Sequence, residues 1–232
     1  DATSHQAKIP DFTKTLDMGV KGLRIGYLYK DLAGLEAAHA ILEPTLSIFT
    51  ELGAEVSLAN ALDPRPSIAV YTVVQRAEVS SNLGRFDGIR YGNDRSFFGD
   101  EAKRRIMLGT YALSKGYADQ YYLTAQKVRT RYILDYQKLF EEFDVLVSPT
   151  SPGFAKKIGA TEGAAMFGEL EDLLLEPSSL SGLPGISIPC HKDPTTGLYL
   201  GMNIIAPMYR EDLVIQVADA FEKHTTHNPW RN

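Results

Sequence analysis

Three consecutive cations, residues 103–105, are the first feature of this sequence with an obvious chemical use. The residues around them have a helical pattern, and a cationic run on a helix is usually a solvated surface or pairs with acids such as Asp100 and Glu101. An arginine can also hold a carboxylate through two parallel charge-assisted hydrogen bonds, which lysine cannot reproduce. Arg105 precedes the apolar Ile106 and is expected at the edge of a buried face, with the other two cations exposed.

Carboxylates and a tyrosine elsewhere in the chain could also bind a polar ligand. Glu169, Glu171 and Asp172 form an acidic cluster, which would attract an ammonium group but more commonly faces solvent. Tyr71 follows the spacing of a helix, where a tyrosine more commonly packs in the core. Neither pattern specifies a site by itself.

The remaining nucleophiles and metal-ligand types give weaker signals. Serines crowd residues 178–182, but no G-x-S-x-G elbow surrounds them, so a capped turn feeding a strand is expected there. Cys190 is the only cysteine, which excludes an internal disulfide and a thiolate metal cage. His224 and His227 are expected in a solvated tail rather than at a metal. Glycine-rich phosphate loops are absent from the sequence.

Hydrophobic periodicity predicts the elements that position these residues. Strand, helix and strand with short joins favour a parallel βαβ unit at the start of the chain. The order of elements indicates an α/β fold with a mixed β-sheet flanked by helices. The predicted strands are residues 22–28, 54–59, 145–147, 186–190 and 199–206, the last two as a hairpin; the predicted helices are 32–52, 66–83, two helices within 99–143, a short one at 166–175 ending before Pro177, and 211–223.

Bulk composition sets further bounds on the molecule. The 232 residues, 44% hydrophobic and 23% charged, suffice for a single domain, which we divide into an extended linker (1–21) with a turn near residues 10 and 11, an α/β body (22–223) and a tail (224–232). A formal net charge of −5 argues against a chain that grips nucleic acid by itself. No apolar run is long enough to span a bilayer, and one cysteine fits a reducing compartment, so no membrane partner and a cytoplasmic location are expected.

Several blocks of the sequence, in order along the chain, resemble the amidase signature family. Within it they are closely similar to the A-subunit family of glutamine-dependent aspartyl/glutamyl-tRNA amidotransferases. The similarity extends from residue 1 to about residue 225, so it is more specific than any single motif. The blocks are residues 21–26, 78–83, 85–92, 98–99, 103–106, 108–110, 126–130, 148–150 and 183–190.

This resemblance implies a fold and a reaction. Family members hydrolyse amides with a serine nucleophile, a second serine in a cis peptide and a lysine base, all in a glycine- and serine-rich signature. That signature does not occur here, and residues 1–4 resemble the point just after it. We therefore expect the C-terminal part of the amidase signature fold, part of an ammonia-supplying amidase and ligase component in protein biosynthesis, without glutaminase activity of its own.

The resemblance also implies which residues hold the substrate. Free glutamine carries a carboxylate and an ammonium, and the family places these contacts on Arg105 and Asp172, with Tyr71 as a pocket residue. Catalytic residues, metals and cofactors are not expected in this chain; ATP and magnesium would be used by a partner subunit. The implied partners are glutamine, the absent N-terminal half, the B and C subunits and, through them, mischarged Glu-tRNA(Gln) or Asp-tRNA(Asn).

Two other functions stay open at this point. The chain could belong to an amidase-signature hydrolase of a different amide, although a hydrophobic amide needs no carboxylate clamp. It could instead be a non-catalytic binding or assembly module with the same fold. The loop between residues 92 and 98 is shorter than in the family, and residues 174–176 and 178–179 differ mildly from the commoner family residues.

Overall fold

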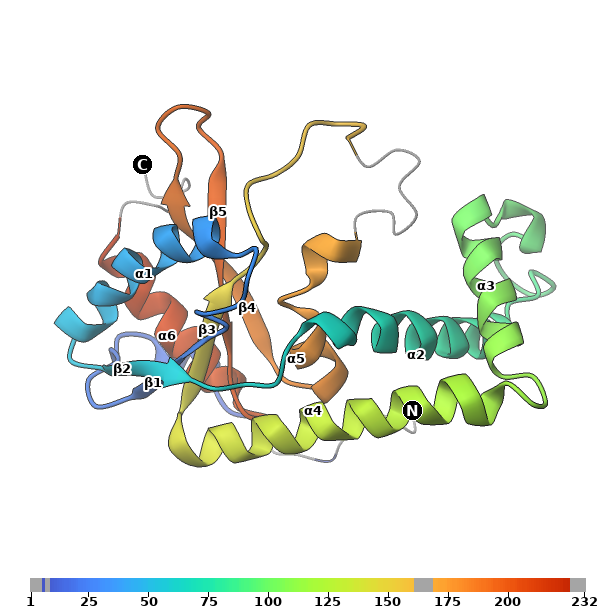
Figure 1. Ribbon diagram of the computed structural model, residues 1–232, viewed down its shortest axis with the longest axis horizontal. Helices are drawn as coiled ribbons and strands as arrows, with labels where there is room; N and C mark the ends of the chain where they lie inside the picture. Colours follow the sequence, from blue (N-terminus) through green and yellow to red (C-terminus); the bar gives the residue numbers. More distant parts are fainter. Residues whose placement is uncertain (1–5, 7–8, 161–168, 226–232) are drawn as a thin grey trace.

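The computed structural model describes residue 6 and residues 9–160 and 169–225, and its centre is a five-stranded mixed sheet (Figure 1). The strand order is β2-β1-β3-β5-β4, so β1 lies between β2 and β3, and β5 lies between β3 and β4. The strands are β1 (Arg24–Leu28), β2 (Glu55–Ala59), β3 (Val145–Pro149), β4 (Gly185–Lys192) and β5 (Tyr199–Ile205).

The first three strands form the parallel part of the sheet. β1 pairs with β2 on one side and with β3 on the other, both in parallel. Helix α1 (Glu36–Glu51) connects β1 to β2, and Gly53 after it has a φ of 88°, the left-handed conformation that ends many helices. The predicted βαβ unit is therefore confirmed.

The antiparallel part follows from the predicted hairpin, which is also confirmed. β5 pairs with β3 and with β4, antiparallel in both cases. The register of β4 shifts between Pro189 and His191, where proline cannot donate a ladder hydrogen bond. The sheet is thus mixed, as the order of elements indicated.

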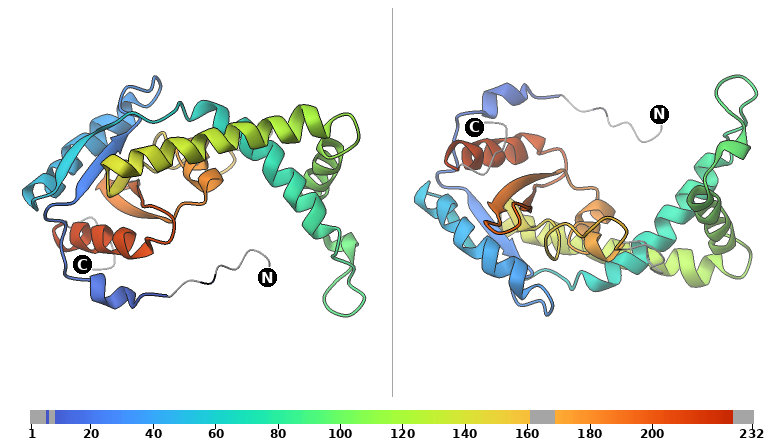
Figure 2. Two further views of the ribbon diagram at one scale, coloured as in Figure 1. Left: turned by 90° about the horizontal axis from the view of Figure 1, so that it is seen from below. Right: turned by 90° about the horizontal axis from the view of Figure 1, so that it is seen from above.

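Helices cover both faces of the sheet (Figure 2). One core packs α1 and α6 (Glu211–Lys223) against one face, with Phe49 and Phe221 fully buried and their ring centroids 5.5 Å apart. The other core packs α4 (Leu123–Glu142) on the opposite face through Tyr136, Leu139 and the following Phe143. Successive side chains of a strand point to opposite faces of the sheet, so neighbouring strand residues are buried alternately in these two cores.

A helical arm extends from the sheet (Figure 1). It consists of α2 (Arg65–Leu83), α3 (Asp100–Ala112), a π-helical turn (Ala118–Tyr122) and the first half of α4. A small core between α2, α4 and α5 (Glu176–Ser181) joins the arm to the rest of the molecule, and its buried members are Val70, Val74, Ala125, Tyr132 and Leu180.

One stretch differs from its prediction. The sequence predicts a turn at residues 178–181, but they lie in the short helix α5. Pro177 lies in the first turn of this helix, which begins at Glu176, because proline is tolerated there, where no N–H partner is needed. Of the helix predicted at 166–175, residues 166–168 lie outside the described part of the chain, and Glu169–Asp172 form a 3₁₀ turn.

The segment before the sheet contains a turn next to residues 10 and 11, close to where the sequence predicts one, and it also packs against the body of the molecule. Asp11 caps a 3₁₀ turn, Phe12–Thr15, and Val20 is buried in the core of α1 and α6. The amide of Gln216 donates to the carbonyl of Gly19 at 2.7 Å, which holds this segment against α6. In the described part of the chain no helix is long and apolar enough to cross a membrane.

Candidate functional site

Helix α2 connects the three residues that the sequence proposed as a binding site. Tyr71 lies on α2 itself, and α2 contacts both α3, which carries Arg105, and the 3₁₀ turn that ends at Asp172. The site therefore depends on how α3 and the turn pack on this one helix.

Tyr71 is half-buried at a cavity of about 200 Å³ between α2, α4 and α5. The cavity is polar on one side, where Glu176 is 7% exposed and Arg129 donates from Nε to the carbonyl of Leu180 at 2.7 Å. Its other side is formed by the small core of the arm. The full lining is Tyr71, Val74, Gln75, Glu78, Arg129, Glu176, Ser179 and Leu180.

Arg105 projects from α3 and is 28% exposed, at the edge of a buried face as expected. Its Nε donates to Oε1 of Glu101, one turn earlier in the helix, at 2.7 Å. The Glu101 carboxyl has a pKa below its ordinary value, chiefly because of this hydrogen bond. The sequence allowed the cations at 103–105 either to face solvent or to pair with a nearby acid. Arg105 forms such a pair.

Gly109 sets the distance between α3 and α2. A Cβ at this position would lie 1.8 Å from the carbonyl oxygen of Arg76 and 2.8 Å from Cβ of Ser80, both on α2. Only glycine permits so close an approach of two helix backbones. Because Gly109 lies four residues after Arg105, the same face of α3 that carries Arg105 is held against α2.

Asp172 is exposed at the end of its 3₁₀ turn, and its carbonyl accepts a hydrogen bond from the amide of Leu175 at 2.8 Å. Neither Asp172 nor Arg105 lines the cavity beside Tyr71. The structure thus brings the three predicted residues to elements around α2, while the cavity itself contains only Tyr71 of the three.

The sequence interpretation missed Glu176 and Arg129 as cavity residues. Glu176 lies in the first turn of α5, where a carboxylate is favoured by the helix dipole. A proline at 177 followed by a glycine at 182, whose φ is 70°, is the usual signature of a short helix and could have revealed it. Nothing in the sequence near Arg129 indicates that it contacts the α5 backbone.

Two of the three serines of α5 bind the backbone of the helix and its preceding residue. Ser178 and Ser181 donate their hydroxyls to the carbonyls of Leu175 and Pro177, each at 2.8 Å. Cys190 is fully buried, and burial raises the pKa of its thiol to about 12. His224 contacts the carbonyl of Ala220, His227 lies outside the described residues, and the described part contains no group of three or more potential metal ligands.

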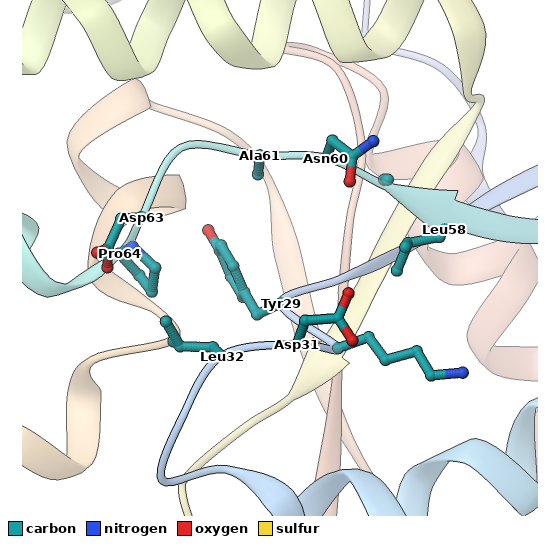
Figure 3. Close-up of a pocket in the computed structure, with 10 residues that line it drawn as sticks. Tyr29, Asp31, Leu32, Leu58, Asn60, Ala61, Asp63 and Pro64 are labelled. Carbon is teal, nitrogen blue, oxygen red and sulfur yellow. The ribbon is translucent and has the colours of Figure 1, made fainter.

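A second cavity, of about 240 Å³, lies at the carboxyl ends of β1 and β2 (Figure 3). Leu32 after β1 and Ala61 after β2 both pack against the core under α4, and the cavity lies between these two exits. Two of its charged side chains have partners in the chain, because Lys30 pairs with Glu43 and Asp63 pairs with Arg65. The cavity lies where ligands commonly bind in α/β sheets, at the carboxyl ends of the strands. Two of its three charged lining residues, however, already form ion pairs within the chain.

The fold and the arm are those of a known family, and the chain belongs to the amidase family, whose pattern matches residues 1–215. Among named relatives, the A subunit of glutamyl-tRNA(Gln) amidotransferase from Acaryochloris marina is 41% identical over 242 residues, covering 97% of this chain and 50% of that protein. The corresponding protein of Bacillus pumilus is 42% identical over 250 residues, covering 98% and 50%. The chain thus spans about half the length of these relatives.

Solved structures agree with this assignment. The crystal structure of the A subunit of glutamyl-tRNA(Gln) amidotransferase from Thermotoga maritima superposes with a TM-score of 0.74 at 30% identity, covering 98% of this chain and 48% of that one. A bacterial aryl acylamidase of the amidase signature family superposes with a TM-score of 0.73 at 23% identity, covering 100% and 48%. The second likeness concerns the fold alone. The predicted family and fold are confirmed.

Proposed function

We propose that this chain is part of the A subunit of a glutamine-dependent tRNA amidotransferase and supplies residues of its glutamine pocket. The observation that carries this proposal is the identity of about 40% to such A subunits over almost the whole chain. The full subunit would hydrolyse glutamine and pass ammonia to a partner that amidates mischarged Glu-tRNA(Gln) or Asp-tRNA(Asn), using ATP and magnesium.

In this proposal Arg105 holds the α-carboxylate of glutamine and Asp172 holds its α-ammonium. A guanidinium matches the planar geometry of a carboxylate, which a lysine cannot do. Tyr71 forms a wall of the pocket beside them. All three residues lie on α2 or on elements that contact it, which supports a common site.

The chemistry of amide cleavage would come from residues outside this chain. The serine nucleophile, the second serine and the lysine base belong to a signature that the 232 residues do not contain. The B and C subunits would complete the complex with the full-length protein.

Replacing Arg105 by alanine in the full-length subunit tests this proposal. We expect the KM for glutamine to rise by at least about tenfold, because charge-assisted hydrogen bonds to the carboxylate are lost. Arg104→Ala is the matched control, since Arg104 is the adjacent arginine and is 45% exposed. Its KM should stay within about twofold of the wild-type value, since exposed ion pairs contribute little.

An unchanged KM for Arg105→Ala would instead favour a hydrolase of another amide, whose fold the aryl acylamidase shares. The isolated 232-residue chain offers a second measurement. It should release no ammonia from glutamine, and measurable release would contradict the assignment of the nucleophile to another part of the protein.

A further inference from the structure

We infer that Glu101 is a positioning residue for substrate binding, which holds the Arg105 guanidinium in the orientation that receives the substrate carboxylate. This inference rests on the proposed function, because it assigns Glu101 a role only through Arg105. It adds a residue that the sequence pattern showed only as one possible ion-pair partner.

The contact between the two side chains is direct and local. Glu101 and Arg105 are four residues apart, so their side chains lie on the same face of α3. The Nε of Arg105 donates to Oε1 of Glu101 at 2.7 Å, a short charge-assisted hydrogen bond. The glutamate is 40% exposed and the arginine 28% exposed, so the pair lies at the boundary between protein and solvent.

The atom that Glu101 contacts on the arginine matters for the ligand. An arginine side chain has many rotamers, and only some of them orient the guanidinium so that it can bind the carboxylate of the ligand. Nε is the guanidinium nitrogen nearest the aliphatic part of the side chain, so its hydrogen bond to Glu101 restricts the orientation of the guanidinium plane. Orientation of this kind contributes to binding and rate without any contact between the positioning residue and the substrate.

The charge state of Glu101 suits this role. Arg105 lowers the pKa of the Glu101 carboxyl first through the hydrogen bond and then through its charge, and Arg104 and Arg76 lower it further. Glu101 therefore stays ionised throughout the physiological range, and its bond to Arg105 stays charge-assisted.

The helix that carries the pair is itself fixed. Residues 101, 105 and 109 recur every four residues along α3, and Gly109 meets the backbone of α2 at Arg76. The start of the Arg105 side chain is thus held by helix packing, and its end is held by Glu101. Loss of Glu101 should remove the contact at Nε and leave the fold intact.

Steady-state kinetics of the full-length subunit test the inference. Glu101→Ala should raise the KM for glutamine by roughly tenfold and leave kcat within about twofold, since a misoriented Arg105 weakens binding and not bond cleavage. Glu101→Gln keeps an oxygen acceptor of the same shape and should recover most of the KM. Asp100→Ala is the matched control: it removes a neighbouring acid of the same helical turn and should leave KM unchanged.

A double-mutant cycle separates positioning from a general structural effect. In the Arg105→Ala background, the further change Glu101→Ala should have no effect on KM, because no guanidinium is left to orient. An equal effect in both backgrounds would overturn the inference. Thermal melts of each variant monitor folding, and Glu101→Met, which also removes the acceptor oxygens but keeps the length of the side chain, gives the same comparison if the alanine variant does not fold.

Failure of the inference differs from failure of the proposed function. If Arg105→Ala leaves KM unchanged, the assignment of Arg105 to glutamine fails, and the role of Glu101 fails with it. If Arg105→Ala raises KM but Glu101→Ala does not, only the positioning role is wrong.

Discussion

His39 and Tyr27 form a buried polar pair in the core between α1 and the sheet. Each is 4% exposed, and the Tyr27 hydroxyl is hydrogen-bonded to Nδ1 of His39. Burial lowers the pKa of His39, and this effect outweighs the opposing ones of the Tyr29 backbone and of the nearby acids Glu43, Asp31 and Glu36. The imidazole is therefore held in its neutral form.

This pair predicts a loss of stability in mild acid. The folded-state pKa of His39 is below its unfolded value of about 6.5, so the unfolded state binds the proton more readily. The contribution is fully present above the unfolded pKa and is lost as the pH falls below it. We expect the melting temperature to fall between pH 7 and pH 5, as measured by circular dichroism.

A variant without either polar partner supplies the control. In the double variant Tyr27→Phe with His39→Leu, neither polar group remains to be left unsatisfied, and the decline should be shallower than in the wild type. Equal declines for the two proteins would show that another group causes the acid sensitivity.

Individual site residues were predicted from their chemistry and from family resemblance, and the structure adds what each one contacts. Arg105 was expected at the edge of a buried face, and it lies there with Glu101 as its partner. Glu176 was not predicted, because its burial depends on the packing of α5 against α2, which sequence spacing does not reveal. The roles of Arg105, Asp172 and Tyr71 stay predictions.

At the scale of elements, the packing of α3 on α2 depends on Gly109. Gly109→Ala would place a Cβ 1.8 Å from a backbone carbonyl, which cannot move away as a flexible side chain could. We expect a loss of at least about 2 kcal/mol in the free energy of unfolding, because overpacking forces the helix backbones apart. Chemical denaturation of the purified protein measures this loss.

Gly153 provides a matched glycine for this test. A Cβ at Gly153 would meet no atom within 4 Å, so Gly153→Ala should change stability by no more than about 0.5 kcal/mol. If the two variants were equally stable, α3 would not be held by the close approach at Gly109.

Elements with a strong period or an apolar run were predicted well, and short elements without either were not. The predicted helix 211–223 agrees with α6 (Glu211–Lys223), and the five strands lie where apolar runs placed them. The six-residue helix α5 has too few residues to show a period, and its proline was interpreted as a stop signal. The turn Phe12–Thr15, by contrast, lies next to the predicted turn at residues 10 and 11, because Asp11 caps it.

At the scale of the whole molecule, the sheet has two outer strands, β2 and β4, in the described part of the chain. An outer strand presents backbone groups that can pair with another chain. We expect the isolated 232-residue protein to associate with itself as its concentration rises, which light scattering after size-exclusion chromatography measures. A monomer at all concentrations would contradict this expectation.

A charge on the outer strand should reduce this association. Ser57 is exposed on β2, so Ser57→Lys introduces a charge that opposes pairing between edges. Ser47→Lys makes the same change on the exposed surface of α1 and is the matched control. Equal association of the two variants would show that the contact is made elsewhere.

Helix α4 connects the sheet to the helical arm, so a small rotation of its sheet end produces a larger displacement at its far end. Its 20 residues span about 30 Å, from the sheet, where Phe143 follows its last turn, to the π-helical turn beside α3. A tilt of about 5° at the sheet therefore moves the far end by roughly 2.6 Å. A Cβ at Gly26 would lie 2.9 Å from Cγ of Phe143, so Gly26→Ala would press on the sheet end of α4 and displace its far end, where the helix meets the elements around α3.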